Sequence, residues 1–243
     1  MVVSLDTIKQ KLLANDRFRI VFLGDSLTSP EWVHPNWREI VEYVIKEELA
    51  KKMGDWKPSS WGVRGINSGL DGATSKDLLE RLDSDVFTYS PEMVFCSIGI
   101  NDIYFDISAK EHQENVRKLL RKIASKVEHV VFCTSIATDR ESLNRTYADY
   151  VKADKVLFPM KGVGFVNLFE RYQKFDLKRF FTFVSGGNEV VGIKPGEIDY
   201  LHPNQLGNAY VAKVILAEAF GVEFDPEVYI KDSQNEAVQY PSY

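Results

Sequence analysis

The sequence predicts an α/β fold in which helices cover both faces of a parallel β-sheet. Short apolar runs of strand length alternate along the chain with segments whose apolar residues recur at helical spacing. Strand–helix alternation of this kind is typical of parallel sheets, whose strands are buried on both faces. The 243 residues, 44% of them apolar, are enough to form a sizeable core in one such domain.

Five apolar segments are predicted to form the strands, at residues 20–23, 61–66, 93–98, 130–136 and 164–169. These runs are short and rich in β-branched and aromatic side chains, which favour a pleated and buried surface. The second run is the least apolar of the five, and we expect a shorter strand there.

Helices are predicted before and between these strands. A short leading helix is indicated by the partial helical spacing of three residues, Ile8, Leu12 and Leu13. The pairs Asn36/Glu39 and Ser108/Glu111 have the spacing of capping boxes and indicate where two longer helices begin. The polar segment 54–60 is expected to be a connection.

The last third of the chain departs from this alternation. Residues 180–196 combine apolar clusters with glycines and a proline, and we expect a hairpin or flap there. Pro203 indicates the start of a last helix, because its missing N–H is not needed in a first turn. We expect a single domain over 1–243 with a core at about 18–220 and a surface strap at 221–243.

Composition and charge exclude several classes of partner. The net charge is −5 and no block of Lys or Arg is present, so no nucleic-acid partner is expected. No apolar run has the length of a membrane span, and the first residues do not resemble a signal peptide. We therefore expect a cytoplasmic protein that does not insert into membranes, unless a signal has been removed.

The two cysteines, Cys96 and Cys133, each lie inside a predicted strand. Free cysteine packs as a small apolar residue, so both are expected to be buried thiols. Neither Cys nor His has the spacing of a metal site, and no metal ligand is expected.

A polar cluster, Gly24-Asp25-Ser26, follows the first predicted strand at once. In open α/β sheets, the loops after the carboxyl ends of the strands line the ligand-binding crevice. Ser26 is therefore a candidate nucleophile, although a serine in this context can also simply cap a turn. A serine hydroxyl needs a general base, a group that orients the base, and donors for the oxyanion.

His202 is the candidate base, and Asp199 is the group that would orient it. The short loop between them can place the imidazole beside Ser26 while the carboxylate accepts from the other ring nitrogen. An alternative is that Asp199 caps the helix that follows.

The other three histidines are weaker candidates. His34 follows a proline-bounded loop with only Glu31 as a nearby carboxylate. His112 and His129 are expected to be exposed, on a helix and at the start of a strand.

Four stretches carry these residues: GDSL at 24–27, NSGLDGAT at 67–74, GIND at 99–102 and DYLH at 199–202. In this order they resemble the signature blocks of the SGNH hydrolase superfamily, the GDSL-type esterases and lipases. The resemblance extends from residue 18 to about 207. It implies a three-layer α/β/α fold with a five-stranded parallel sheet in flavodoxin-like order, and an esterase that needs no metal or organic cofactor.

The resemblance also implies an oxyanion hole. Its donors would be the side-chain amide of Asn101 and the backbone N–H groups of Ser26 and of a glycine in the second block. This glycine is Gly69 or Gly72, and the family's spacing from the block's asparagine, Asn67 here, favours Gly72. Asp25 and Asp102 have no direct chemistry in the family and are expected to accept hydrogen bonds that stabilise the loops.

The expected function is hydrolysis of a small-molecule acyl ester through an acyl-enzyme intermediate, on short-chain or carbohydrate O-acyl esters. Trp32, Tyr104 and Phe105 are candidates for the substrate pocket, and packing of the loops is an equal alternative for Trp32 and Phe105. Alternatives are a lysophospholipase or thioesterase, acyl transfer to an alcohol, and a non-catalytic binding protein on the same fold. A nucleotide site is disfavoured because no Walker or dinucleotide glycine pattern is present.

Overall fold

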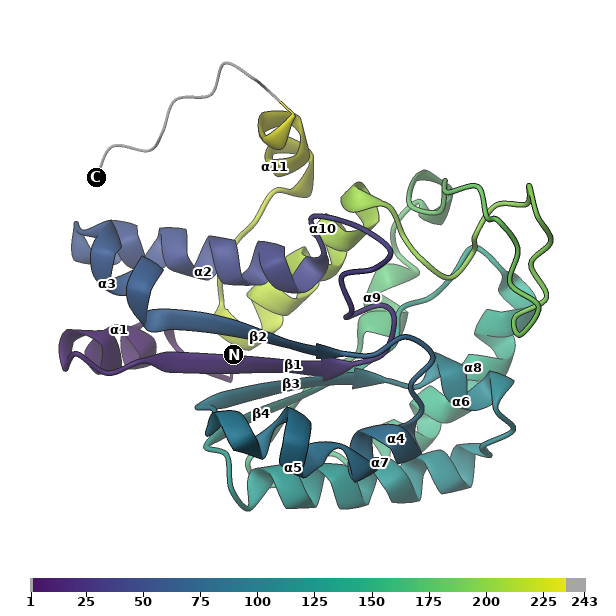
Figure 1. Cartoon of the computed structure of the whole chain (residues 1–243), viewed down its shortest axis with the longest axis horizontal. Helices are drawn as coiled ribbons and strands as arrows, with labels where there is room; N and C mark the ends of the chain where they lie inside the picture. Colours follow the sequence, from purple (N-terminus) through teal and green to yellow (C-terminus); the bar gives the residue numbers. More distant parts are fainter. Residues whose placement is uncertain (1, 235–243) are drawn as a thin grey trace.

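Five parallel strands form the centre of the computed structural model, which describes residues 2–234 (Figure 1). The strands are β1 (Phe18–Gly24), β2 (Val63–Gly69), β3 (Met93–Ile98), β4 (His129–Thr134) and β5 (Val163–Val166). They lie in the order β2-β1-β3-β4-β5, and each neighbouring pair is parallel. This is the flavodoxin-like order, so the predicted fold class is confirmed.

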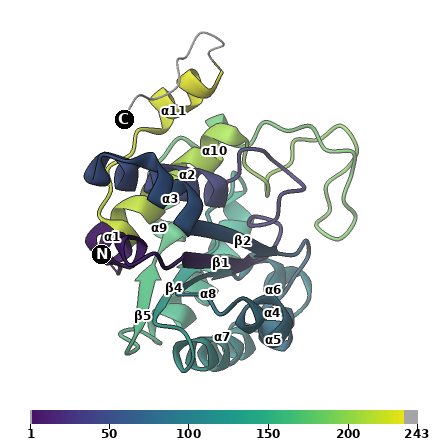
Figure 2. The same ribbon diagram turned by 60° about the vertical axis from the view of Figure 1, so that its left-hand side comes forward.

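Helices cover both faces of the sheet (Figures 1 and 2). One face packs against α1 (Leu5–Leu13), α2 (Trp37–Met53), α9 (Leu168–Tyr172) and α10 (Gln205–Ile215). The other packs against α4 (Ser75–Glu80), α5 (Leu82–Asp85) and α7 (Ala109–Ala124). The remaining helical elements are α3 (Trp56–Gly62), η1 (Phe87–Tyr89), α6 (Ile100–Tyr104), α8 (Glu141–Lys155), η2 (Leu177–Arg179), the π-helical η3 (Leu216–Phe220) and α11 (Pro226–Ser233).

The apolar run of β1 is continuous because both of its faces are buried. Ile20 and Phe22 belong to the core on the α2 side, whereas Val21 and Leu23 belong to the core on the α7 side. Burying one such side chain contributes about 1.5–3 kcal/mol, so every residue of the run favours the central position in the sheet.

The strand register brings three loops to one edge of the sheet. Gly24 at the end of β1 pairs with Gly69 of β2 on one side and with Ser97 of β3 on the other. The N–H of Leu70, just after β2, donates to the carbonyl oxygen of Gly24 at 3.1 Å. The order of the strands reverses at β1, and this switch point is where open α/β sheets bind ligands.

The segment 54–60, expected to be a connection, is mostly helical. Helix α3 begins after Asp55, whose side chain accepts from the N–H of Lys57. Strand β2 therefore begins at Val63 rather than at 61, and Trp61 lies on the helix with its side chain exposed. The strand also continues to Gly69, because it pairs with β1 along its whole length.

Other predicted boundaries also differ from the structure. Leu13 of the leading helix is exposed, although Leu12 is buried. Strand β5 ends at Val166 because the next residue, Asn167, caps helix α9 by accepting from the N–H of Glu170. Strand β4 ends at Thr134, two residues before the predicted end.

The chain after β5 is only partly as expected. Residues 180–196 lie in a segment that folds back on itself through two antiparallel bridges, Val184–Ile198 and Asn188–Ile193, as expected of a hairpin or flap. The predicted extended strap at 221–243 is wrong for 226–233, which form α11 with Asp225 as its cap. Residues 235–243 of that strap lie outside the described residues.

Candidate active site

Ser26 lies in the tight turn that follows β1. The carbonyl oxygen of Asp25 accepts from the N–H groups of Thr28 and Ser29, both at 3.0 Å, and these bonds close the turn. The side chain of Ser26 is only 8% exposed, and its Oγ lies 3.0 Å from Nε2 of His202. The turn thus directs the hydroxyl across the edge of the sheet toward the loop before α10.

His202 is held by Asp199 on its other side. Nδ1 of His202 lies 2.7 Å from Oδ2 of Asp199. The other carboxylate oxygen accepts from the N–H groups of Leu201 and His202, which fixes the loop. Burial alone would raise the pKa of Asp199, but the hydrogen bond with His202 and these backbone bonds outweigh it and lower the pKa.

Asp199 does not cap the last helix. Helix α10 begins at Gln205, and the side chain of Asn204 caps it by accepting from the N–H of Gly207 at 3.0 Å. Pro203 accordingly lies before the helix rather than in its first turn. The carboxylate of Asp199 is therefore committed to its own loop and to His202.

Trp32 covers the imidazole of His202. The two rings are stacked, with centroids 3.9 Å apart and planes 5° from parallel. Nε1 of Trp32 donates to Oδ1 of Asp71 at 3.2 Å, which anchors the indole to the loop after β2. Trp32 is 39% exposed, so part of the indole is accessible beside His202. The sequence did not single out Asp71, although it lies in the second motif.

Asn101 comes from the first turn of α6, directly after β3, and is largely buried. Its Nδ2 donates to the carbonyl oxygen of Ala73 at 2.9 Å, which orients the amide toward the second loop. A side-chain amide nitrogen carries two hydrogens, so this bond leaves one available.

The two glycines of the second loop are not equivalent. Gly69 donates its N–H to Oδ1 of Asn67 at 3.0 Å, and a Cβ there would lie 2.4 Å from the backbone nitrogen of Ser29. Gly72 has a φ of +71°, open space around it, and an N–H that meets no acceptor within residues 2–234. The glycine of this loop with an uncommitted N–H is thus Gly72.

Tyr104 and Phe105, the other two pocket candidates, differ from each other in their contacts and exposure. The hydroxyl of Tyr104 is 3.2 Å from that of Tyr200, which belongs to the loop between Asp199 and His202. The guanidinium of Arg140 lies over the Tyr200 ring at 3.6 Å. Phe105 is half exposed. The sequence did not single out Tyr200 or Arg140.

Asp25 and Asp102 both accept backbone hydrogen bonds, as expected. Oδ1 of Asp25 accepts from the N–H of Leu27, and Oδ1 of Asp102 accepts from the N–H of Ser75. Asp25 is fully buried, and its Oδ2 has no hydrogen-bond partner among residues 2–234. Burial raises the pKa of Asp25 from its ordinary value of 3.8 to about 7, although the bond from Leu27 opposes this.

This raised pKa predicts how stability depends on pH. Between about pH 4 and pH 7 the folded protein holds a proton on Asp25 that the unfolded chain has lost, so stability falls as the pH rises. Asp25→Asn removes this slope, and the variant gains on the order of 2–3 kcal/mol relative to the native sequence between pH 5 and pH 8. Urea denaturation at several pH values measures the free energy of unfolding of both proteins, with Asp83→Asn, a substitution at an exposed residue, as control. Identical slopes in native and Asp25→Asn proteins would refute the prediction.

The prediction that His112 and His129 are exposed is wrong. His129 is partly buried at the start of β4, and its ring stacks on Phe18. His112 is fully buried, because two carboxylates from other helices, Asp102 and Asp154, face its ring. Cys96 and Cys133 are buried free thiols, as predicted.

Among residues 2–234, no group of three or more His, Cys, Asp or Glu side chains is arranged to hold a metal ion. None of the helices in this range has the length and apolar character needed to cross a membrane.

A serine, an imidazole and a carboxylate in hydrogen-bonded sequence, at the carboxyl edge of a flavodoxin-like sheet, define the site of a serine hydrolase. The model of the GDSL-like lipase/acylhydrolase family matches residues 22–210, and the chain belongs to this family. The resemblance seen in the four motifs is thus confirmed, and the protein is a carboxylic ester hydrolase.

The chain is similar to hydrolases that share about a fifth of its residues. An acetylxylan esterase from Geobacillus stearothermophilus is 23% identical over 218 residues, which cover 82% of this chain and 93% of that protein. A crystal structure of an acetylxylan esterase from the same species matches with a TM-score of 0.63 at 20% identity, covering 87% of this chain and 96% of the other. An α/β hydrolase enzyme from the metagenome of Lake Arreo, Spain, matches with a TM-score of 0.62 at 20% identity, covering 84% and 95%.

Proposed function

We propose that this esterase removes short acyl groups, acetyl above all, from hydroxyls of a carbohydrate, with Ser26 as its nucleophile. The observation that carries the proposal is the hydrogen-bonded chain from Ser26 through His202 to Asp199, with distances of 3.0 and 2.7 Å. Solved variants of the acetylxylan esterase from G. stearothermophilus in which a serine, an aspartate or a histidine is replaced by alanine are described as catalytic mutants, which supports the same three roles.

Acylation begins when Oγ of Ser26 attacks the ester carbonyl carbon and Nε2 of His202 takes the hydroxyl proton. Asp199 keeps Nδ1 protonated and stabilises the imidazolium that forms. His202 then returns the proton to the leaving alcohol oxygen as the ester bond breaks. In the second half, His202 deprotonates a water that attacks the acyl-enzyme, and the carboxylic acid leaves with Ser26 restored.

Negative charge develops on the carbonyl oxygen in both halves. We assign its stabilisation to Nδ2 of Asn101 and to the N–H groups of Ser26 and Gly72. The orientation of Asn101 by Ala73 and the uncommitted N–H of Gly72 support this assignment. Donors held in place before the reaction are effective because they need no rearrangement in the transition state.

One feature of the site favours a sugar as the alcohol part of the ester. Trp32, which stacks on His202, is 39% exposed, and the accessible part of its indole offers an apolar surface on which a sugar ring can stack. The relative described as an acetylxylan esterase supports the same substrate class.

The test compares substrates on one enzyme preparation. We expect kcat/KM to fall roughly tenfold or more from p-nitrophenyl acetate to the octanoate ester, and acetate to be released from acetylated xylo-oligosaccharides. A preference that rises with acyl length, or faster cleavage of a lysophospholipid or an acyl thioester, would replace this proposal with the lipolytic alternative. Failure to cleave any ester would favour a binding role, and ester formation with added alcohol would indicate acyl transfer.

A further inference from the structure

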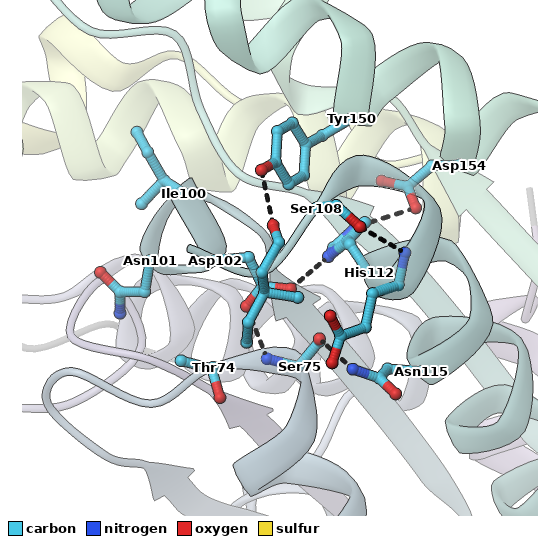
Figure 3. Close-up of polar contacts among 12 residues, drawn as sticks. Thr74, Ser75, Ile100, Asn101, Asp102, Ser108, His112, Asn115, Tyr150 and Asp154 are labelled. Atoms are coloured by element: carbon cyan, nitrogen blue, oxygen red, sulfur yellow. Dashed lines mark hydrogen bonds and ion pairs between the residues drawn. The ribbon is translucent and has the colours of Figure 1, made fainter. Parts of the chain in front are cut away.

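His112 lies in the first half of α7, fully buried between two carboxylates (Figure 3). Its Nδ1 is 2.7 Å from Oδ2 of Asp102 on α6, and its Nε2 is 3.1 Å from Oδ1 of Asp154 on α8. Tyr150, also on α8, packs edge-on against the ring and donates its hydroxyl proton to the carbonyl oxygen of Ile107. The imidazole thus joins three helices, and no step of the proposed mechanism uses it.

With both carboxylates ionised, both ring nitrogens of His112 donate, because an ionised carboxylate can only accept. Burial alone would lower the pKa of His112, but the hydrogen bonds and charges of Asp102 and Asp154 outweigh it and raise the pKa to about 9. Burial raises the pKa of Asp154, and the hydrogen bond and charge of His112 oppose this. Its Oδ2 has no hydrogen-bond partner among residues 2–234, so His112 is the partner that favours its ionised form.

The other end of this network reaches the second loop of the active site. Asp102 follows Asn101 directly, and its Oδ1 accepts from the N–H of Ser75 at 2.8 Å. Asn101 itself donates to Ala73, two residues before Ser75. Two adjacent residues of α6 therefore hold the same short segment, which begins just after Gly72. Figure 3 shows Asp102 between His112 and Ser75.

We propose that His112 is a positioning residue of the oxyanion hole: doubly protonated between Asp102 and Asp154, it fixes the orientation of Asp102, and Asp102 holds the loop of Gly72 in register with Asn101. This inference rests on the proposed function. His112 touches neither the substrate nor Ser26 in this mechanism. It acts through Asp102 alone.

Two substitutions separate positioning from general support of the fold. The amide nitrogen of an asparagine reaches about as far along the side chain as Nδ1 of histidine, and that of a glutamine about as far as Nε2. His112→Asn can therefore still donate to Asp102, whereas His112→Gln can donate only to Asp154. Both variants lose one of the two buried bonds, so we expect similar decreases in melting temperature.

Their kinetics should differ. We expect His112→Gln to lower kcat for p-nitrophenyl acetate roughly tenfold with KM little changed, because the oxyanion contacts strengthen only in the transition state. His112→Asn should retain most of the activity. Tyr150→Phe, which removes the hydrogen bond to Ile107 but keeps the ring against His112, is the matched control and should keep the native kcat. Equal kcat losses in both His112 variants, or a loss confined to KM, would overturn the inference.

A second measurement holds even if both variants fail to fold. In ¹⁵N NMR of the native protein at pH 8, both ring nitrogens of His112 should show N–H signals. A neutral His112 at that pH would overturn the inference. Reaction of native Ser26 with a fluorophosphonate tests the proposed function separately, so failure of one can be told from failure of the other.

Discussion

Ser26→Ala is expected to lower kcat for ester hydrolysis by on the order of 10⁵–10⁶-fold, because it removes the hydroxyl that forms the acyl-enzyme in the proposed mechanism. The hydroxyl lies 3.0 Å from Nε2 of His202, which is the distance needed for proton transfer during attack. The same variant should lose the covalent adduct that a fluorophosphonate forms with the native protein. Intact-mass spectrometry measures the adduct, and single-turnover assays with p-nitrophenyl acetate measure the rate.

Ser97→Ala is the matched control. Ser97 is also a buried serine, at the end of the neighbouring strand β3, where it pairs with Gly24. It should keep both adduct and activity. The double variant Ser26→Ala/His202→Ala should lose little beyond Ser26→Ala, because nucleophile and base act as one unit. An adduct that persists in Ser26→Ala would show that another residue is the nucleophile.

The strands could be predicted from the sequence because burial on both faces leaves a continuous apolar run. Residues 93–98 form β3 with the predicted bounds for this reason. Helix α3 was missed because the segment 54–60, which contains most of it, is polar and mostly exposed, so no apolar periodicity was present. The helix begins after a cap from Asp55. One capping residue is not enough to predict a helix in a segment that also contains a glycine and a proline.

The site could be predicted as far as its chemistry is carried by short motifs. Ser26 and His202 are 176 positions apart, and their proximity was predicted from the four motifs, each at a predicted strand end or loop. The stacking of Trp32 on His202 could not be read from the sequence, because the conformation of the loop decides it.

The position of His112 in the helical repeat indicated burial, whereas its residue type suggested exposure. His112 lies four residues before Val116 and therefore on the buried face of α7, together with Leu119 and Ile123. Histidine is usually read as a surface residue on a helix, and the carboxylates that stabilise it come from other segments of the chain. Helical phase was thus the better guide at this position.

Asn101→Ala is expected to lower kcat by about 10²–10³-fold while KM changes little, since a donor aimed at the oxyanion stabilises the transition state more than the bound ester. The structure gives the reason for the size of the effect. One hydrogen of Nδ2 bonds to Ala73, which holds the amide in place, and the site is largely buried, so water cannot replace the other hydrogen at low cost. Steady-state kinetics with p-nitrophenyl acetate measures both constants.

Two further variants show whether the donor or only the side chain matters. Asn101→Asp keeps the shape of the side chain but replaces the donor with a negative charge, so its kcat should be at least as low as that of Asn101→Ala. Asn67→Ala, in the second motif, removes an exposed amide whose Oδ1 accepts from Gly69, and it should affect kcat far less. If Asn101→Asp retained native kcat, the oxyanion would have to be stabilised by the backbone N–H groups of Ser26 and Gly72 alone. If Asn101→Ala raised KM instead of lowering kcat, Asn101 would contact the substrate in its ground state.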